Sequence, residues 1–245
     1  MQIRLDKYLS DSTAYSRSEI KTYIKKGQAE VNSKVCRDPG LKVDPDRDEV
    51  CLKGQRLNWQ RFHYYMLNKP PGLLSATEDA SQNTVLELFP PGLRKGLFPV
   101  GRLDKDTVGL LLITDDGELA HSLLSPGRHV NKTYLVHTAD PLSAEDADAF
   151  KDGTELKDGT LLKSAVLDIN DNDPRVAKIT IQEGKYHQIK RMIASRGNKV
   201  VYLKRLSMGS LTLDENLREG EYRPLREDEL QSLRETHSLN ELKPQ

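Results

Sequence analysis

A dense polar loop between two short apolar runs is the feature that most constrains this chain. The loop covers residues 101–109 (GRLDKDTVG), with apolar runs at 97–100 before it and 110–113 after it. Short apolar runs bounded by Gly and Pro predict buried strands. A loop held between two buried strands is rigidly placed, which suits a catalytic group, and Asp104 is the candidate. The alternative is that Asp104 and Asp106 only cap a turn and pair with neighbouring cations.

Length and composition predict a cytoplasmic protein that is long enough to bury a hydrophobic core. The chain has 245 residues, of which 36% are hydrophobic and 30% charged, enough for one large domain or two smaller ones. It has no run of 18 apolar residues, so no membrane span is expected, and no signal-peptide apolar stretch follows Met1. Cys36 and Cys51 lack metal-ligand spacing, so we expect reduced thiols.

The formal net charge is zero, but the charges are unevenly distributed. Residues 185–205 carry seven Lys or Arg side chains and no acid, whereas residues 138–173 are rich in acids. A neutral total that conceals a basic stretch predicts a protein that binds an anion on one face.

Residues 1–52 predict a small module of short helices and strands. Ser16 and Glu19 are spaced as a capping box at the start of a helix, and Gly27 ends it. Strands are expected at 29–32, 34–36 and 49–52. The polar, irregular residues 53–62 predict a linker.

Four cations of this module recur at helical spacing and should project to one side of the helix. The members of this row are Arg17, Lys21, Lys25 and Lys26. Such a row can hold phosphates without reading sequence. The alternative is a solvated helix face with no ligand.

The remainder of the chain predicts an α+β domain around a mixed, largely antiparallel β-sheet, because strands and helices do not alternate strictly. Strands are expected at 64–69, 132–136, near 161–169, 175–182, 200–203, 211–213 and 222–225. Helices are expected at 84–88, 118–124, 144–150, 187–196 and 226–233.

Residues 101–117 (GRLDKDTVGLLLITDDG) resemble the signature of pseudouridine synthases, in the form carried by the RsuA family, which modifies ribosomal RNA. The KPPG segment at 69–72 is also similar, and residues 1–52 resemble the RNA-binding module first named in ribosomal protein S-four. The resemblance runs from Arg4 to about Leu233. It implies an S-four-like RNA-binding domain at 1–58, a catalytic domain at 59–235 and a flexible tail at 236–245.

The resemblance also implies roles for individual side chains. Asp104 matches the catalytic aspartate, and Tyr134 matches the tyrosine that stacks on the target base, although packing within a sheet would also explain an aromatic there. Lys190 matches the cation that pairs with the aspartate, and such a cation keeps a carboxylate ionised. Arg191 is its rival for that role and otherwise a candidate RNA contact. Arg102 matches an RNA-binding arginine.

Pseudouridine formation is an isomerisation, so the resemblance implies no cofactor and no metal. The segments 183–188 (EGKYHQ) and 220–225 (GEYRPL) are closer to synthases of small-subunit (16S) rRNA than to those of large-subunit rRNA. The expected partner is therefore 16S rRNA, free or in an assembling small subunit. The protein is expected to act as a monomer and not to bind a membrane.

Three alternatives were considered. The first is the same chemistry on 23S rRNA. The second is a non-catalytic assembly factor, which would not require Asp104, Tyr134 and Lys190. The third is a hydrolase that uses Asp104 and Asp106 as paired carboxylates. Residues two apart on an extended stretch point to opposite faces, which argues against such a pair.

Overall fold

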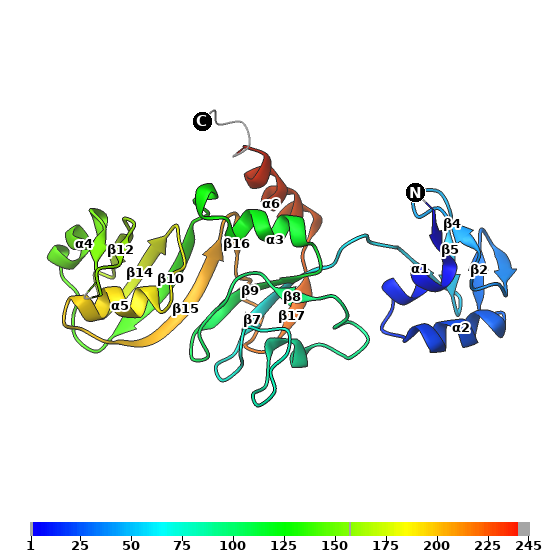
Figure 1. The fold of residues 1–245 in the computed structure, drawn as a ribbon, viewed down its shortest axis with the longest axis horizontal. Helices are drawn as coiled ribbons and strands as arrows, with labels where there is room; N and C mark the ends of the chain where they lie inside the picture. Colours follow the sequence, from blue (N-terminus) through cyan, green and yellow to red (C-terminus); the bar gives the residue numbers. More distant parts are fainter. Residues whose placement is uncertain (1, 157, 240–245) are drawn as a thin grey trace. The chain divides into compact units, whose positions relative to one another are not determined.

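A nine-stranded sheet forms the centre of the larger of two units in this chain (Figure 1). The computed structural model describes residues 2–156 and 158–239. The larger unit begins at Tyr64, and the smaller one comprises the residues up to His63 together with Phe89–Leu97. No helix in the described part of the chain is long and apolar enough to span a membrane.

The sheet is mixed and largely antiparallel, as the sequence predicted. Its strands are β7 (Tyr64–Lys69), β8 (Phe98–Pro99), β9 (Val108–Thr114), β10 (Lys132–Thr138), β13 (Val166–Ile169), β14 (Val176–Ile181), β15 (Val200–Met208), β16 (Leu211–Thr212) and β17 (Tyr222–Pro224). Their order is β13-β14-β10-β15-β9-β7-β17, with β16 beside β15 and β8 beside β9. Strands β15 and β9 run parallel, and the other pairs run antiparallel.

The burial of each strand follows its sequence pattern. Every residue of β7 and β9 is buried, as expected for strands with apolar runs covered on both faces, although β7 ends in the polar residues Asn68 and Lys69. In β10 buried and half-buried residues alternate, so one face lies against the core. The apolar run at 97–100 contributes only the two-residue β8, in which Pro99 lies opposite Ile113 of β9 and has no N–H to donate.

Helices cover two regions of the sheet (Figure 1). They are α3 (Gly117–Leu124), α4 (Ala144–Lys151), α5 (Gln188–Ser195) and α6 (Glu227–Leu239), with 3₁₀ turns η1 (Val85–Leu88) and η2 (Pro126–Arg128) and a hairpin of β11 (Thr154–Glu155) and β12 (Leu161–Leu162). Helices α3 and α6 pack together, whereas α4 contacts β13 and α5 contacts β15.

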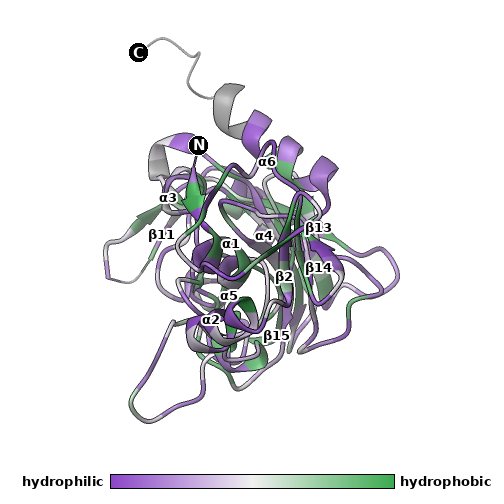
Figure 2. Ribbon diagram, turned by 90° about the vertical axis from the view of Figure 1, so that its right-hand side faces the viewer, coloured by the Kyte–Doolittle hydropathy of each residue, from purple (hydrophilic) through white to green (hydrophobic). Residues whose placement is uncertain are grey.

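Helix α6 is longer than the sequence indicated. It was expected to end at residue 233 and continues to Leu239, within the predicted tail, whose residues 240–245 lie outside the described part of the chain. Figure 2 shows mostly hydrophilic turns along α6. Leu230 and Leu233 are buried, so its apolar side supplies the packing.

The smaller unit has two helices and a four-stranded sheet. Helices α1 (Leu5–Asp11) and α2 (Arg17–Lys25) accompany β1 (Ile3–Arg4), β2 (Ala29–Val31), β3 (Lys34–Cys36), β4 (Lys42–Val43), β5 (Val50–Leu52) and β6 (Gln55–Leu57). The sheet order is β3-β2-β5-β6, and β1 pairs with β4. The expected capping box of Ser16 and Glu19 starts α2. Ile20 and Ile24 of α2 join Leu5 and Leu9 of α1 in one apolar cluster.

The predicted linker at 53–62 is wrong over its first half. Strand β6 lies within it and pairs with β5, so these residues complete the small sheet. Trp59 packs partly against the apolar cluster and its indole N–H donates to Asp11, while His63 bonds the Asp11 carbonyl. The smaller unit therefore extends past residue 58, where the sequence placed its boundary.

Candidate active site

The loop that carries Asp104 is held from behind by buried groups. Lys69, at the end of β7, is fully buried, and its ammonium donates to the carbonyls of Pro70, Lys105 and Thr107 at 3.0, 3.3 and 2.9 Å. The Ser75 hydroxyl donates to the Leu103 carbonyl and accepts from the Leu103 N–H. Because these bonds fix the backbone on both sides of Asp104, its carboxylate is placed by the fold.

Burial lowers the pKa of Lys69 to about 8, although the charges of Asp106 and Asp104 oppose this shift. The group is therefore predominantly protonated at neutral pH. An ammonium has three donors and no acceptor, which suits a site where three carbonyls converge. Lys69 belongs to the KPPG segment, yet its position behind the loop could not be read from that segment alone.

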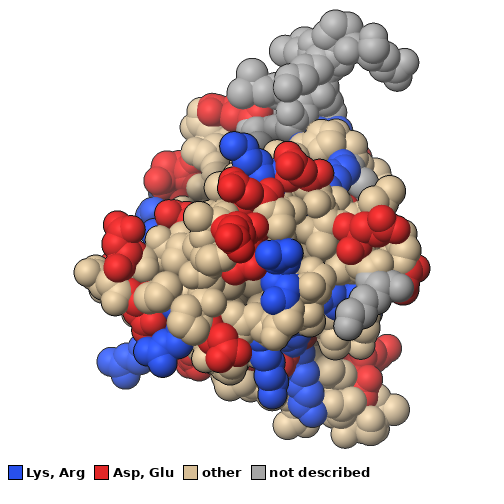
Figure 3. Space-filling view, turned by 90° about the vertical axis from the view of Figure 1, so that its left-hand side faces the viewer, with Lys and Arg blue, Asp and Glu red and all other residues tan. Residues whose placement is uncertain are grey.

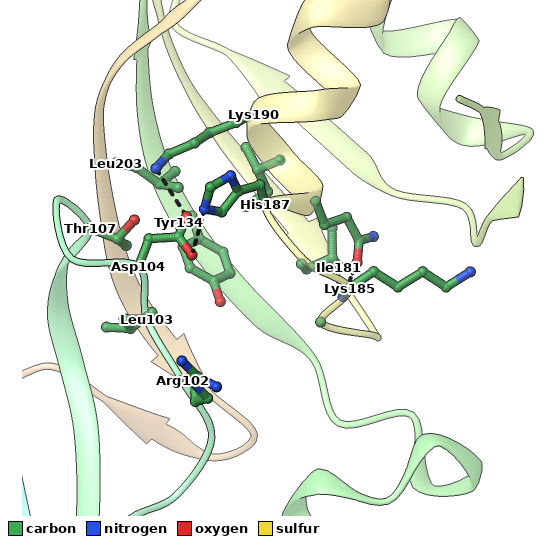
Figure 4. A pocket seen from close by; sticks show the side chains of 13 residues that line it. Arg102, Leu103, Asp104, Thr107, Tyr134, Ile181, Lys185, His187, Lys190 and Leu203 are labelled. Atoms are coloured by element: carbon green, nitrogen blue, oxygen red, sulfur yellow. Dashed lines mark hydrogen bonds and ion pairs between the residues drawn. The ribbon is translucent and has the colours of Figure 1, made fainter. Parts of the chain in front are cut away.

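Helix α5 brings Lys190 to this loop (Figure 4). Its ammonium lies 3.0 Å from Asp104 Oδ2 and 2.6 Å from Asp106 Oδ1. His187, at the start of α5, places Nε2 3.6 Å from Asp104 Oδ1. The expected contact between Lys190 and Asp104 is thus present. His187 is a further member that the sequence did not indicate, and Asp106, which the sequence offered only as the second carboxylate of a hydrolase, shares Lys190 with Asp104.

The ion pair shifts the pKa values of Lys190 and Asp106. Burial lowers the pKa of Lys190, but its hydrogen bonds and charge interactions with Asp106 and Asp104 outweigh this and raise the pKa overall. The hydrogen bond from Lys190 lowers the pKa of Asp106. Both shifts favour the ionised forms of these partners at neutral pH.

The two carboxylates point to the same amine, contrary to the argument made from an extended chain. Residues 104–107 form a turn, in which the Thr107 N–H donates to the Asp104 carbonyl at 3.1 Å. A turn changes the direction of the backbone within two residues, so alternation of side chains does not apply. Asp106 is nevertheless 74% exposed in its side chain, against 28% for Asp104.

Tyr134 forms one wall of the pocket beside Asp104. It belongs to β10, is 7% exposed, and lies with Leu203 and Ile181 around a cavity of about 70 Å³. Figure 4 shows the ring next to the Asp104 carboxylate, with Arg102 beyond its hydroxyl. An aromatic ring and two aliphatic side chains make an apolar surface suited to a planar base.

The approach of two strands behind this pocket requires a glycine. Gly109 in β9 has φ +98°, and a Cβ placed there would lie 2.4 Å from the Arg205 carbonyl oxygen. This contact is at the parallel pairing of β15 with β9, directly after the Asp104 loop. A side chain at position 109 would separate these strands and move the loop.

The other cations predicted to contact RNA lie in three different places. Arg191 ion-pairs with Asp158 and does not contact Asp104, so it takes a different side of α5 from Lys190. Arg102 is exposed at the rim of the pocket. The smaller unit carries the four cations predicted at helical spacing, which are all exposed and are named the α2 cation row: Arg17, Lys21, Lys25 and Lys26.

The basic stretch at 185–205 does not form one continuous basic surface. Arg191 and Arg196 pair with Asp158 and Asp146, and Arg205 is only 2% exposed. Figure 3, which shows the α4 and α5 end of the larger unit, has basic and acidic atoms interspersed. The prediction of an anion-binding face in this stretch therefore applies to individual side chains, not to the stretch as a whole.

Comparison with known proteins identifies the family. Residues 63–195 match the RNA pseudouridylate synthase family model, and residues 3–49 match the S4 domain model. The chain is 49% identical to the RNA pseudouridine synthase YtzG of Bacillus subtilis (strain 168) over 98% of this chain and 99% of that protein. It is 40% identical to ribosomal small subunit pseudouridine synthase A of Escherichia coli (strain K12) over 94% and 100% of the two chains.

A solved structure agrees with this assignment. A crystal structure of a pseudouridylate synthase aligns with a TM-score of 0.67 and 38% sequence identity, covering 94% of this chain and 99% of that one. The chain therefore belongs to the RNA pseudouridylate synthase family and carries an N-terminal S4 domain.

Proposed function

We propose that this protein converts a specific uridine of small-subunit (16S) ribosomal RNA to pseudouridine, acting as a monomer in the cytoplasm. Relatives that align over nearly their whole length are named ribosomal small subunit pseudouridine synthase A, which supports this substrate. The S4 domain supports binding to RNA. The substrate is the rRNA itself, free or within an assembling small subunit.

The observation that carries the proposal is the convergence of Asp104, Lys190 and Tyr134 on one pocket. A uridine within structured RNA must leave its stack before its glycosidic bond can react. In the proposed site Tyr134 stacks on the extruded uracil, and the ionised Asp104 acts on the nucleoside as nucleophile or base. Lys190 pairs with this carboxylate at 3.0 Å and holds it in position.

The reaction balances without any added group. The bond from N1 to C1′ breaks, the uracil turns within the pocket, and a bond from C5 to C1′ forms. The proton displaced from C5 is lost, N1 gains one, and the product is an isomer of the substrate. Asp104 is regenerated at the end.

RNA contacts outside the pocket are assigned to exposed cations. The α2 cation row holds phosphates of the rRNA, Arg102 contacts RNA at the rim of the pocket, and Arg191 contacts RNA in addition to its pair with Asp158. These contacts position the RNA without reading its sequence.

Mapping of pseudouridine in rRNA tests the proposal. Ribosomal RNA is compared from cells that contain the wild-type protein, no protein, or Asp104→Asn. We expect one 16S pseudouridine to disappear in the second and third strains, since the amide retains the shape of the carboxylate but not its reactivity. Loss of a 23S site instead would reassign the substrate. Unchanged modification with Asp104→Asn would remove Asp104 from the mechanism and favour a non-catalytic role.

A further inference from the structure

A second cavity of about 300 Å³ adjoins the pocket that contains Asp104. Tyr134 and Arg102 line both cavities, so a strand of RNA whose uracil lies on Tyr134 would continue into the second one. Lys132, Arg205 and Lys185 also line it, together with Glu183. Cations thus outnumber acids among the described residues around this space.

Two of these cations are buried on the same face of the sheet as Tyr134. Lys132 precedes Tyr134 by two residues in β10, and Arg205 in β15 lies directly opposite Tyr134. Lys132 is 8% exposed and Arg205 is 2% exposed. A charged side chain is seldom buried to this extent unless it is paired.

Neither cation has a carboxylate partner among the contacts of the described residues. The Lys132 ammonium donates to the Val130 carbonyl at 3.1 Å, and Arg205 Nε donates to the Leu110 carbonyl at 2.7 Å. Arg205 Nη2 is buried and makes no hydrogen bond within the described part of the chain. An unsatisfied buried charged donor costs free energy that a ligand can recover.

Glu183 does not supply the missing charge. Its Oε1 accepts from the Lys163 backbone N–H at 2.9 Å and from the Gln188 amide at 3.0 Å. The Lys185 ammonium donates to the Leu161 carbonyl, and Figure 4 shows this side chain directed away from Asp104. The positive charge on the sheet face beside Tyr134 therefore comes from Lys132 and Arg205.

The two buried cations repel one another. Burial, and then the charge of Arg205, lower the pKa of Lys132 to about 8. Lys132 is still protonated at neutral pH, so the protein holds two like charges next to its catalytic pocket. A bound anion would offset the repulsion between Lys132 and Arg205 and accept a hydrogen bond from Arg205 Nη2. A neutral uracil could accept that hydrogen bond but would not offset the repulsion.

We infer that this second cavity binds a phosphodiester group of the substrate RNA next to the target uridine, through Lys132 and Arg205. The inference rests on the proposed function. A guanidinium with a free Nη2 and an adjacent ammonium match phosphate oxygens in charge and geometry. The volume exceeds that of a phosphate and admits part of its sugar. A phosphate held here fixes the strand relative to Tyr134 and Asp104.

Substrates with one neutral linkage test this inference. RNAs are made with a single methylphosphonate at each linkage near the target uridine, and kcat/KM is measured for wild type, Lys132→Met and Lys178→Met. Lys178 is the matched control because it is exposed on β14 opposite Leu135, on the other face of the sheet.

We expect the methylphosphonate at one linkage to lower kcat/KM of wild type and of Lys178→Met by about 10- to 100-fold, the range for loss of a hydrogen bond to a charged group. Lys132→Met should have a kcat/KM on unmodified RNA that is lower than the wild-type value by the same factor, and the methylphosphonate at that linkage should not reduce it further. Its melting temperature should not fall, because one of two repelling charges is gone. If Lys132→Met does not fold, Lys132→Gln is measured in its place. Equal sensitivity of Lys132→Met and wild type at every linkage would overturn the inference.

A binding measurement separates this inference from the proposed function. Uridine 3′-monophosphate, uridine 5′-monophosphate and uridine are titrated into wild type and Lys132→Met. We expect one monophosphate to bind wild type at least about tenfold more tightly than uridine, with the difference reduced in Lys132→Met. If no small-subunit RNA is modified, the proposed function fails, and this titration still decides the phosphate site. Equal binding of uridine and both monophosphates to wild type would refute the site.

Discussion

Replacement of Lys190 by Met should move the acid limb of the pH–rate profile to higher pH. Lys190 is shared by Asp104 and Asp106, and its hydrogen bond lowers the pKa of Asp106. Without the ammonium, two carboxylates face one another, with the His187 imidazole 3.6 Å from Asp104 Oδ1 as the remaining basic group in contact with Asp104. The carboxylate pair then takes up a proton at higher pH, and the active, ionised form is lost earlier as the pH falls.

The size of the effect follows from the geometry. Two unit charges at 3.0 Å interact by about 5 kcal/mol at an effective dielectric constant of about 20. The side chains of Lys190 and Asp104 are 24% and 28% exposed, so solvent screens part of this energy. After screening, removal of the ammonium should cost the ionised carboxylates about 2 kcal/mol of favourable charge interaction. At a pH well below the shifted limb, turnover should fall about 30-fold.

Single-turnover rates between pH 4.5 and 8.5 measure this shift free of product release. Arg191→Met is the matched control, because Arg191 follows Lys190 in α5 and pairs with Asp158. Its acid limb should coincide with that of wild type, and Lys190→Arg should retain most of the wild-type profile. The reasoning is refuted if Lys190→Met changes RNA affinity alone, or if Arg191→Met moves the limb equally far.

Three further predictions concern the fold and RNA binding. Replacement of the α2 cation row by four Gln residues should weaken RNA binding and lower the slope of log affinity against log salt by up to about 3, as filter binding would show; an unchanged slope would mean a merely solvated helix face. Lys69→Met should lower single-turnover rate without weakening RNA binding, because three carbonyls around Asp104 lose their donor. Burial lowers the pKa of Lys69 to about 8 from 10.5, so between these pH values the unfolded chain binds more protons than the folded one, and the contribution of Lys69 to stability increases as the pH rises. The difference in free energy of unfolding between wild type and Lys69→Met should therefore widen over this range, and a constant difference would contradict the prediction. Gly109→Ala should lower the melting temperature strongly, because its Cβ would lie 2.4 Å from a backbone oxygen, and a wild-type melting curve would refute that.

Elements with strong local signals were predictable from sequence. The capping box of Ser16 and Glu19, the apolar runs at 64–67 in β7 and 110–113 in β9, and the α+β class each depend on neighbouring residues. Strand β6 was missed because only Leu57 in its three residues is apolar and its other residues are exposed. Pairing with β5 stabilises it, and this tertiary contact has no trace in the local pattern.

The candidate site was predictable where a motif position matched. Asp104, Tyr134 and Lys190 come from three separate segments, and only the resemblance brought them together before the structure did. The convergence of Asp106 on the same amine depends on a turn that the alternation argument excluded. His187 was missed because one histidine in a basic helix carries no spacing signal.

The partners of the buried cations distinguish their roles in a way that counting charges cannot. Lys190 contacts the carboxylates of Asp104 and Asp106, which fits the proposed role of a cation paired with the reactive group. Lys69 meets backbone carbonyls, so it holds a loop in place. Arg205 and Lys132 meet single carbonyls, and Arg205 keeps an unsatisfied buried N–H group beside the pocket. A chain of zero net charge thus places two cations without carboxylate partners, among the described residues, on one face of its sheet. If a phosphodiester group binds there, as inferred above, it offsets the repulsion between these cations, and binding of the RNA strand is then coupled to the position of the base on Tyr134.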